Sequence, residues 1–275
     1  MKVVLITGAS SGIGFDAAKA LALKGYKVYA AARRTALMEP LREFGVEPLR
    51  MDLTDPASVD EAVSRIGSES GGIDILVNNA GYGYLGAIEN VPLEEARKQM
   101  EVNLFGLAGL CRAVIPGMRE KGEGRIVNVS SVAGLVPFYF GDWYNVSKYS
   151  VEALSDAMRI ELKPFGIKVS IIEPGPVKTD WGIIAAKNLA DSSTGTAYEK
   201  EGVRTADTFR KTYEAKHLFP GPGTVTRAIV KAVTRRRPRL RYRVGAAACL
   251  LVFFYRILPH RWWDNISRIT SIVQL

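Results

Sequence analysis

The sequence has few of the residues that build metal sites and disulfide frameworks. Its 275 residues include 2 cysteines and 2 histidines. Cys111 and Cys249 have no paired spacing, and His217 and His260 lie far from both along the chain. We therefore expect neither a metal site nor a disulfide scaffold, which is typical of a protein from a reducing cytoplasm.

Long hydrophobic runs are missing as well. Met1 and Lys2 lead directly into a short apolar run and a glycine-rich loop without a cleavage-site pattern, so no secretory signal is expected. The apolar run 244–255 has 12 residues before Arg256, whereas a membrane-spanning helix needs roughly 20. These features predict a cytoplasmic protein without a transmembrane helix.

Acidic residues are nearly absent from the C-terminal part of the chain. Residues 1–224 hold 26 Lys+Arg against 27 Asp+Glu, whereas residues 225–275 hold 11 against 1, so the tail carries the net charge of +9. Nucleic acid is not expected as a partner, because the basic segment 235–243 lacks a recognised binding module. Arginines flanking an apolar helix, with Trp262 and Trp263 after it, suit a membrane-surface segment and equally a lid or a dimer contact.

Strand-like runs alternate with helix-like segments from the first residue. Near-continuous apolar runs such as residues 3–6 are typical of strands buried on both faces, and right-handed crossovers then give a doubly wound parallel sheet. We predict an α/β fold with helices on both faces, one catalytic domain over residues 1–244 and a helical tail over 245–275. The expected strands are 2–7, 27–32, 46–51, 73–78, 125–130 and 168–172.

One long polar segment, residues 187–216, has no clear periodicity. Loops of this length inside a compact domain are usually functional lids. We therefore expect either a lid or a short helical excursion at the surface.

The first turn between strand and helix is rich in glycine. Gly8, Gly12 and Gly14 follow a strand and open a helix, in the spacing G-xxx-G-x-G. Glycines let the backbone turn sharply and approach a pyrophosphate, which the N–H groups at a helix N-terminus favour. The context favours a dinucleotide site over a merely structural turn.

Tyr144 and Lys148 lie four residues apart in a helix-like segment. Side chains at this spacing share one face of a helix, so an ammonium would lie beside a phenol. A nearby positive charge favours the phenolate and would lower the pKa of Tyr144 toward neutral pH. The pair therefore suits a proton donor and acceptor at an alcohol or carbonyl oxygen, although the same spacing is also that of an ordinary solvated helix edge.

Several motifs together resemble those of the short-chain dehydrogenase/reductase family. The resemblance is close over residues 2 to about 180 and looser to about 244. It implies a Rossmann-type fold, hydride transfer to or from a nicotinamide cofactor, and a homodimer or homotetramer. The motifs are, in order, Thr7-Gly8-xxx-Gly12-x-Gly14, Asn78-Asn79-Ala80-Gly81, Asn103, Val127-Asn128-Val129-Ser130-Ser131, Tyr144-xxx-Lys148 and Pro174-Gly175.

The resemblance implies roles for the reacting groups. Tyr144 would be the general acid/base, Lys148 would lower its pKa and hold the nicotinamide ribose, and Ser131 would position the substrate oxygen. Asn103 would complete a proton relay to Lys148, or serve as a structural polar group. Because side chains alternate along a strand, only one of Ser130 and Ser131 should face the site, and the resemblance favours Ser131.

The resemblance also implies a cofactor site built from several segments. Asp52 would receive the adenine amino group, with a helix-capping carboxylate as the alternative, while Val177 and Thr179 would meet the nicotinamide end. The expected cofactor-binding residues are Gly8, Ser10, Ser11, Gly12, Ile13, Gly14, Arg33, Arg34, Asp52, Leu53, Asn79, Ala80, Gly81, Tyr144, Lys148, Pro174, Gly175, Val177 and Thr179.

The end of the second strand predicts which nicotinamide cofactor is used. An acidic residue there would bind the ribose hydroxyls of NAD, whereas an arginine accommodates the 2′-phosphate of NADP. The strand is followed by Arg33 and Arg34 and no carboxylate. A guanidinium suits phosphate geometry, so NADP is the predicted cofactor, with a merely basic surface loop as the alternative.

Large apolar residues near the expected site predict a hydrophobic alcohol, ketone or aldehyde as substrate, although some of them could fill the core. Within the family, the tail resembles members similar to hydroxysteroid and retinol dehydrogenases and acyl-dihydroxyacetone-phosphate reductases. Two alternatives are an NADP(H)-binding sensor or scaffold without turnover, and a peripheral membrane protein held by its basic tail. The apolar residues are Leu135, Val136, Pro137, Phe138, Phe140, Trp143, Trp181, Ile183 and Ile184.

Overall fold

Seven parallel strands form one sheet in the computed structural model, which describes residues 1–215 and 219–272. Their order across the sheet is β3-β2-β1-β4-β5-β6-β7. The predicted doubly wound fold is confirmed, and each predicted strand is present with small shifts at its ends. The strands are β1 (Val3–Thr7), β2 (Lys27–Ala32), β3 (Glu47–Arg50), β4 (Ile75–Asn78), β5 (Gly124–Val129), β6 (Ile167–Pro174) and β7 (Arg241–Val244).

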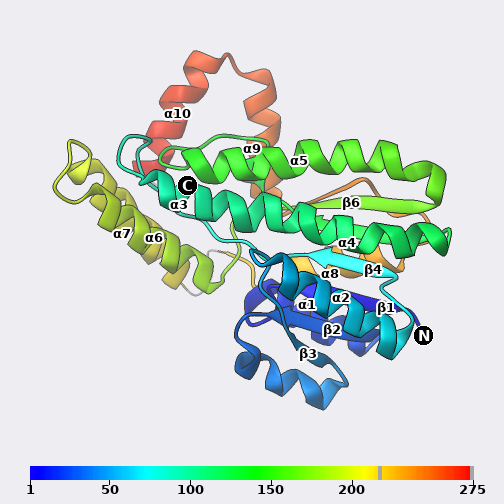
Figure 1. Cartoon of the computed structure of the whole chain (residues 1–275). Helices are drawn as coiled ribbons and strands as arrows, with labels where there is room; N and C mark the ends of the chain where they lie inside the picture. The colour runs from blue at the N-terminus through cyan, green and yellow to red at the C-terminus, as the bar shows by residue number, and fades with distance from the viewer. Residues whose placement is uncertain (216–218, 273–275) are drawn as a thin grey trace.

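Helices cover both faces of the sheet (Figure 1). The buried side chains of α1, α8 and the 3-10 helix Thr35–Phe44 form one core with one face, and those of α2, α4 and α5 form a second core with the other. Every residue of β1 is buried, as expected for a central strand with a core on each side. The helices are α1 (Gly12–Ala22), α2 (Pro56–Ser70), α3 (Leu93–Met100), α4 (Leu107–Glu120), α5 (Asp142–Leu162), α6 (Asp180–Ser193), α7 (Glu199–Glu214), α8 (Gly223–Thr234), α9 (Ala246–Ile257) and α10 (His260–Ile272).

The strand order reverses between β1 and β4, which are neighbours in the sheet although two strands separate them in sequence. In open parallel sheets, ligands bind outside the carboxyl ends of the strands at such a reversal. Thr7 ends β1 and Asn78 ends β4, so the glycine-rich loop and the Asn78–Gly81 segment meet at this point.

The polar segment 187–216 forms most of two packed helices rather than a loop. It contains the end of α6 and all of α7, while Lys216 lies outside the described residues, as does His217. The two helices approach through small residues, since a Cβ on Gly202 would lie 2.0 Å from the Ser193 side chain. Elsewhere the contact is aromatic, between Trp181 of α6 and Tyr213 of α7. The other buried residues of α7 are small or polar, so the apolar stripe is weak in the sequence. The prediction of a short helical excursion was therefore nearer to the structure.

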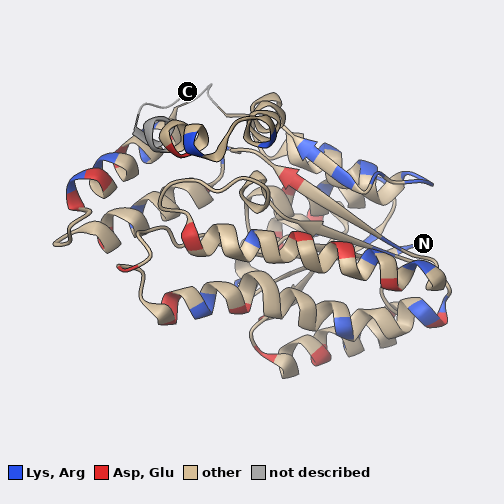
Figure 2. Cartoon of the chain, turned by 90° about the horizontal axis from the view of Figure 1, so that it is seen from above, with Lys and Arg blue, Asp and Glu red and all other residues tan. Residues whose placement is uncertain are grey.

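The sheet has a seventh strand that the sequence did not predict. β7 lies within the basic segment, and Figure 2 shows Lys and Arg gathered along it and the turn before it. Its alternate arginines are neutralised by carboxylates from elsewhere: Arg241 lies 3.1 Å and Arg243 3.0 Å from the two carboxylate oxygens of Glu173 on β6. Arg241 also reaches Glu152 and Asp156 on α5, at 3.2 and 2.6 Å.

The tail folds into α9 and α10, which lie at the end of the sheet away from the N-terminus (Figure 1). Residues 273–275 of the predicted tail lie outside the described residues. Within the described part of the chain, no helix combines the length and apolar character needed to cross a bilayer.

The charged cluster around Arg241 should matter for stability. Replacing Arg241 with Met leaves the buried carboxylates of Glu152 and Glu173 with less positive charge, which should lower the free energy of unfolding by about 2 kcal/mol. The matched control is Arg42→Met, whose partners Glu39 and Glu47 are at the surface, so the loss should stay below about 1 kcal/mol. Urea unfolding measures both variants, and equal losses would contradict the assignment.

Candidate active site

A cavity of about 1740 Å³ opens at the carboxyl ends of the strands. It brings together nearly all the residues that the sequence predicted for cofactor binding and catalysis, from segments spread over most of the chain. Only Gly14 and Asn103 of the predicted set do not line it. The predicted residues in its wall are Gly8, Ser10, Ser11, Gly12, Ile13, Arg33, Arg34, Asp52, Leu53, Asn79, Ala80, Gly81, Ser131, Tyr144, Lys148, Pro174, Gly175, Val177 and Thr179.

The glycine-rich loop packs tightly against the end of β4. A Cβ on Gly14 would lie 2.5 Å from the Gly8 carbonyl oxygen, and one on Gly8 would lie 2.7 Å from Ala80 Cα. Gly8 also has a φ of +66°, which favours glycine. The Asn79 side chain donates to the carbonyl oxygens of Thr7 and Gly8 at 3.0 and 3.2 Å. Gly14 therefore shapes the loop from behind instead of lining the cavity.

The loop after β6 closes over the glycine-rich loop. A Cβ on Gly12 would lie 3.2 Å from Thr179 Cγ2, so Thr179 covers the entrance to α1. The backbone N–H of Gly175 donates to the Val244 carbonyl at 2.9 Å, and a Cβ on Gly175 would lie 2.9 Å from that of Ala248. The segment from Pro174 to Thr179 thus joins the glycine-rich loop to the beginning of the tail.

Tyr144 lies in the first turn of α5 with only 7% of its surface exposed. Burial raises the pKa of its phenol to about 12, and a hydrogen bond with Ser131 opposes the shift. The sequence-based expectation of a lowered pKa is therefore wrong for the protein chain alone, because desolvation outweighs the opposing hydrogen bond with Ser131. Tyr144 is held as a neutral phenol.

Lys148 is also buried, with its Nζ 5.9 Å from the centroid of the Tyr144 ring. The ammonium donates to the Val129 carbonyl at 3.0 Å. Burial lowers the pKa of Lys148 to about 8, while the negative charge of Glu152 one turn further along α5 opposes the shift. The pair is thus on one helix face as predicted, and the lysine is poised near neutral pH.

Both neighbouring serines line the cavity, contrary to the expectation that only one would face it. The strand ends at Val129, so strand alternation no longer applies to Ser130 and Ser131. Ser131 caps the short 3-10 helix that follows, accepts from the Ala133 N–H at 3.1 Å and hydrogen-bonds to Tyr144. Of the two, Ser131 is the serine that contacts the phenol.

Asn103 lies behind the cavity in a π-helical turn, Glu101–Gly106. Its side-chain oxygen accepts from the Tyr82 N–H at 3.0 Å, and its amide donates to the Tyr82 carbonyl and to Ser147 Oγ at 2.9 and 3.0 Å. A Cβ on Gly81 would touch both Asn103 Oδ1 and Lys148 Nζ, at 3.0 and 3.5 Å. These hydrogen bonds support a structural role for Asn103. Its side-chain oxygen also approaches the same point beside Gly81 as the Lys148 ammonium.

The end of β2 presents Arg33 and Arg34 to the cavity, both exposed. Within residues 1–215 and 219–267, neither arginine forms an ion pair with a carboxylate. Asp52 accepts from the N–H and hydroxyl of Thr54, at 3.0 and 2.8 Å, which lowers its pKa with help from the charge of Arg33. The helix cap here is Asp55 instead, since its side chain accepts from an N–H in the first turn of α2.

The other end of the cavity is apolar and aromatic. Of the predicted substrate-side residues, Val136, Pro137, Phe138, Trp181 and Ile184 line it, whereas Leu135, Phe140, Trp143 and Ile183 do not. The sequence did not single out the contribution of α7, although its aromatic residues lie four apart, as one helix face requires. The added lining side chains are Phe209 and Tyr213 from α7, Leu250, Leu251 and Phe254 from α9, and Trp262 and Trp263 from α10.

Glu152 is a titratable residue near the site that the sequence did not indicate. Burial raises the pKa of its carboxyl to about 7; hydrogen bonding to Ser130 and the charge of Arg241 oppose the shift, and the charge of Glu173 adds to it. The spacing of four residues from Lys148 is the signal that could have found it.

Comparison with known proteins identifies the family. The model of the short chain dehydrogenase family matches residues 2–188. The chain is 36% identical over 272 residues to the probable short-chain type dehydrogenase/reductase VdlC of Helicobacter pylori, with 98% of both proteins covered. It is 36% identical over 246 residues to 3-ketodihydrosphingosine reductase of Bacteroides thetaiotaomicron, with 89% of this chain and 88% of the relative covered.

Solved structures agree with the sequence relatives. A short-chain dehydrogenase from Streptomyces avermitilis matches with a TM-score of 0.80 at 32% identity, covering 98% of both chains. The closed form of serine dehydrogenase complexed with NADP⁺ matches with a TM-score of 0.77 at 26% identity, covering 89% of this chain and 95% of that one. The chain belongs to the short-chain dehydrogenase/reductase family, as an oxidoreductase that uses NAD or NADP.

Glu152 should give the stability of the fold a pH dependence of known sign. Its pKa of about 7 exceeds the ordinary 4.5, so the folded state resists ionisation and wild type should lose stability as pH rises between these values. Glu152→Gln cannot ionise, so the variant should gain stability relative to wild type over the same range. Urea unfolding at several pH values measures the difference. Glu161→Gln, exposed on the same helix, is the control, and a difference for Glu152→Gln that does not vary with pH would contradict the prediction.

Proposed function

We propose that the protein is an NADP(H)-dependent oxidoreductase that transfers a hydride between the nicotinamide and a hydrophobic secondary alcohol, ketone or aldehyde. The observation that carries the proposal is the placing of Ser131, Tyr144 and Lys148 in one cavity, between a glycine-lined end and an apolar end. The first end suits a dinucleotide and the second suits the substrate, and the reacting groups lie between them.

The residues at the glycine-lined end fit a dinucleotide. Glycines stand where any side chain would collide with the loop or with β4, which leaves backbone N–H groups at the start of α1 to face a pyrophosphate. Arg33 and Arg34 are free of carboxylate partners among the described residues and line the cavity, so they would hold a 2′-phosphate. This fit supports NADP over NAD.

The proposed proton chemistry follows from the burial of Tyr144. When bound, the cofactor supplies or accepts the hydride at its nicotinamide ring. A phenol with a pKa of about 12 is protonated at neutral pH, so Tyr144 is ready to donate its proton to a carbonyl oxygen during reduction. Ser131 would hold that oxygen by a hydrogen bond, and the Lys148 ammonium would stabilise the phenolate that proton donation leaves behind. Asn103 would contribute to the return of the proton through Lys148.

The apolar end supports a large hydrophobic substrate. Its wall is made largely of aromatic and aliphatic side chains from α6, α7, α9 and α10. The relative named 3-ketodihydrosphingosine reductase carries in its name a ketone on a long-chain lipid, which is the kind of molecule that such a wall would accept. We therefore include long-chain ketones and aldehydes among the substrate classes to be tested.

Replacing Tyr144 with Phe should lower kcat by about 10²–10⁴-fold, because the proton donor is lost while the ring keeps its packing. The assay follows NADPH absorbance with steroid ketones, retinal, long-chain aldehydes, a 3-keto sphingoid base and acyl-dihydroxyacetone phosphate. Tyr149→Phe is the matched control, since Tyr149 lies on the same helix outside the cavity wall. Cofactor binding by wild type without turnover on any substrate would favour the sensor or scaffold function instead.

Arg33 should determine the choice of cofactor. Arg33→Ala should weaken NADPH binding by about 10- to 100-fold through the lost charged hydrogen bond, and leave NADH binding nearly unchanged. Fluorescence titration with both cofactors measures the effect. The control is Arg50→Ala, an exposed arginine at the end of β3 that does not line the cavity. Equal weakening for the two cofactors would show that Arg33 does not recognise the phosphate.

A further inference from the structure

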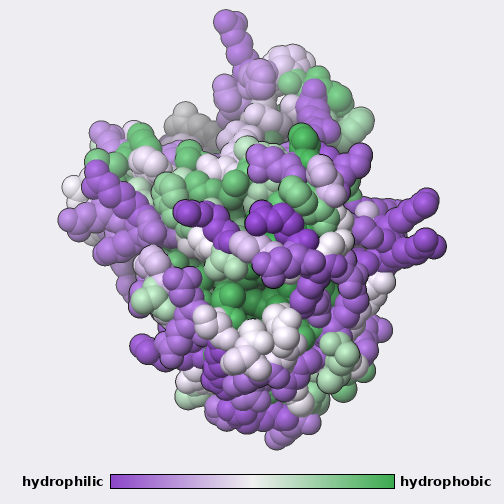
Figure 3. Space-filling model, turned by 45° about the vertical axis from the view of Figure 1, so that its right-hand side comes forward, coloured by the Kyte–Doolittle hydropathy of each residue, from purple (hydrophilic) through white to green (hydrophobic). Residues whose placement is uncertain are grey.

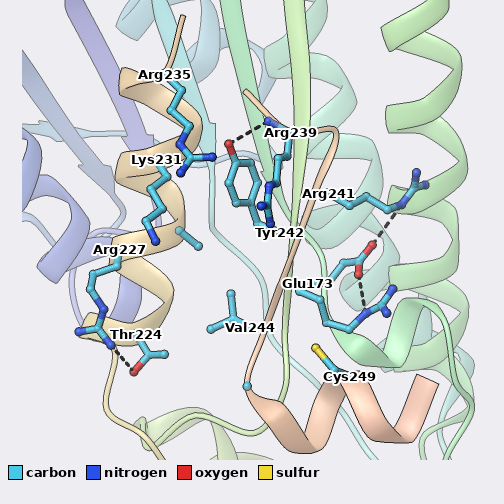
Figure 4. Close-up of a pocket in the computed structure, with 13 residues that line it drawn as sticks. Glu173, Thr224, Arg227, Lys231, Arg235, Arg239, Arg241, Tyr242, Val244 and Cys249 are labelled. Atoms are coloured by element: carbon cyan, nitrogen blue, oxygen red, sulfur yellow. Dashed lines mark hydrogen bonds and ion pairs between the residues drawn. The ribbon is translucent and has the colours of Figure 1, made fainter. Parts of the chain in front are cut away.

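A second pocket, of about 570 Å³, lies between α8 and β7 (Figure 4). We call it the basic pocket, because its wall holds six cationic side chains and one carboxylate. Three of the cations come from α8 and the turn after it, and three from β7 and the residues before it. The charged residues are Arg227, Lys231, Arg235, Arg239, Arg241, Arg243 and Glu173.

Most of this positive charge is not neutralised within the protein. Glu173 is shared by Arg241 and Arg243, while the other four cations form no ion pair with any carboxylate of residues 1–215 and 219–267. Arg227, Lys231 and Arg235 follow one another at intervals of four, on one side of α8 and the turn that continues it. Like charges at that spacing destabilise a helix, so a bound anion would relieve a repulsion that the fold itself leaves.

An exposed apolar surface adjoins the basic pocket. Of the residues of α9, only Ala248 and Val252 are buried. Leu250, Phe253 and Ile257 are 57%, 57% and 58% exposed. Figure 3 shows hydrophobic residues along the right-hand side of the projecting part at the top of the view, where α9 and α10 lie, next to hydrophilic ones. The two surfaces are continuous, because Gly245 and Cys249, at the beginning of α9, line the basic pocket.

Charge decides which occupant fits these two surfaces. Residues 225–275 hold 11 Lys+Arg against 1 Asp+Glu, so a second copy of this chain would place one positive tail against another and the two would repel. An anionic bilayer offers phosphate groups to the basic pocket and an apolar interior to α9. With 12 residues, α9 is too short to cross a membrane and can lie along its surface.

We propose that the basic pocket and the exposed face of α9 dock the protein onto the surface of an anionic lipid bilayer. In this arrangement α9 lies at the lipid interface and is also a wall of the larger cavity, through Leu250, Leu251 and Phe254. The apolar end of that cavity then opens beside the membrane, where hydrophobic molecules are dissolved. Docking itself requires no turnover, so its test is independent of the proposed reaction.

The first test is sedimentation of the full chain with vesicles of phosphatidylcholine, with and without phosphatidylglycerol. We expect binding only to the anionic vesicles, weakened by salt. The triple variant Arg227→Gln, Lys231→Gln, Arg235→Gln should bind about 100-fold more weakly, because each cation near the surface contributes about a factor of five. The control triple variant, Arg97→Gln, Arg112→Gln, Lys163→Gln, removes the same charge from the other face of the sheet and should bind like wild type.

The second test removes the apolar contact. Phe253→Ser with Ile257→Ser should weaken vesicle binding by at least about tenfold, since both exposed side chains lie one turn apart on α9. Neither residue lines the catalytic cavity, so NADPH binding should be retained and serves as the check of folding. Leu23→Ser with Leu93→Ser, exposed elsewhere at 67% and 57%, is the matched control.

Three results would overturn the proposal. One is equal weakening of vesicle binding by the test and control triple variants, which would mean that only total charge matters. Another is a serine double variant that binds vesicles like wild type but dissociates from a dimer to a monomer in sedimentation velocity, which would show that a second copy covers α9. The third is a protein that binds soluble inorganic phosphate in the basic pocket but does not bind anionic vesicles when phosphate is absent.

Discussion

Burying the Lys148 ammonium is the constraint on which much of this structure depends. An uncompensated buried charge costs several kcal/mol, so a backbone carbonyl and the carboxylate of Glu152 accompany it. Glu152 contacts Arg241, and Arg241 shares Glu173 with Arg243. Alternating charges thus extend from the proposed reacting groups, through α5 and β6, to β7. The polar character of the last strand follows from this series, which explains why a strand of arginines can close the sheet.

The parts of the fold that the sequence predicted are those whose signal is local. Apolar runs mark most of the strands from β1 to β6, and glycines mark the loop because a side chain at Gly8 or Gly14 would collide with the backbone. β7 could not be found this way, because the carboxylates that neutralise Arg241 lie 68 or more residues away in sequence. α7 was missed for a different reason, since most of the residues that it buries are glycine, alanine or threonine, which give only a weak apolar period.

For the candidate site, the sequence predicted which residues lie together better than it predicted the direction of their pKa shifts. The spacing of Tyr144 and Lys148 places both on one helix face, and the structure brings them together with Ser131. The direction of the pKa shift of Tyr144 depends on how completely other segments exclude water, and no motif describes that. The apolar end of the cavity was equally hard to predict, because α7, α9 and α10 reach it only through the tertiary fold.

The double use of α9, as a wall of the larger cavity and as an exposed apolar surface, has a kinetic consequence. If a bilayer lies against this helix, the substrate enters from lipid and not from water, so the rate depends on its mole fraction in the membrane rather than on its bulk concentration. Dilution of the substrate with inert lipid would then slow the reaction at constant total substrate. Enzymes that take their substrates from water do not respond in this way, so the proposed docking of α9 would give the reaction surface dilution kinetics.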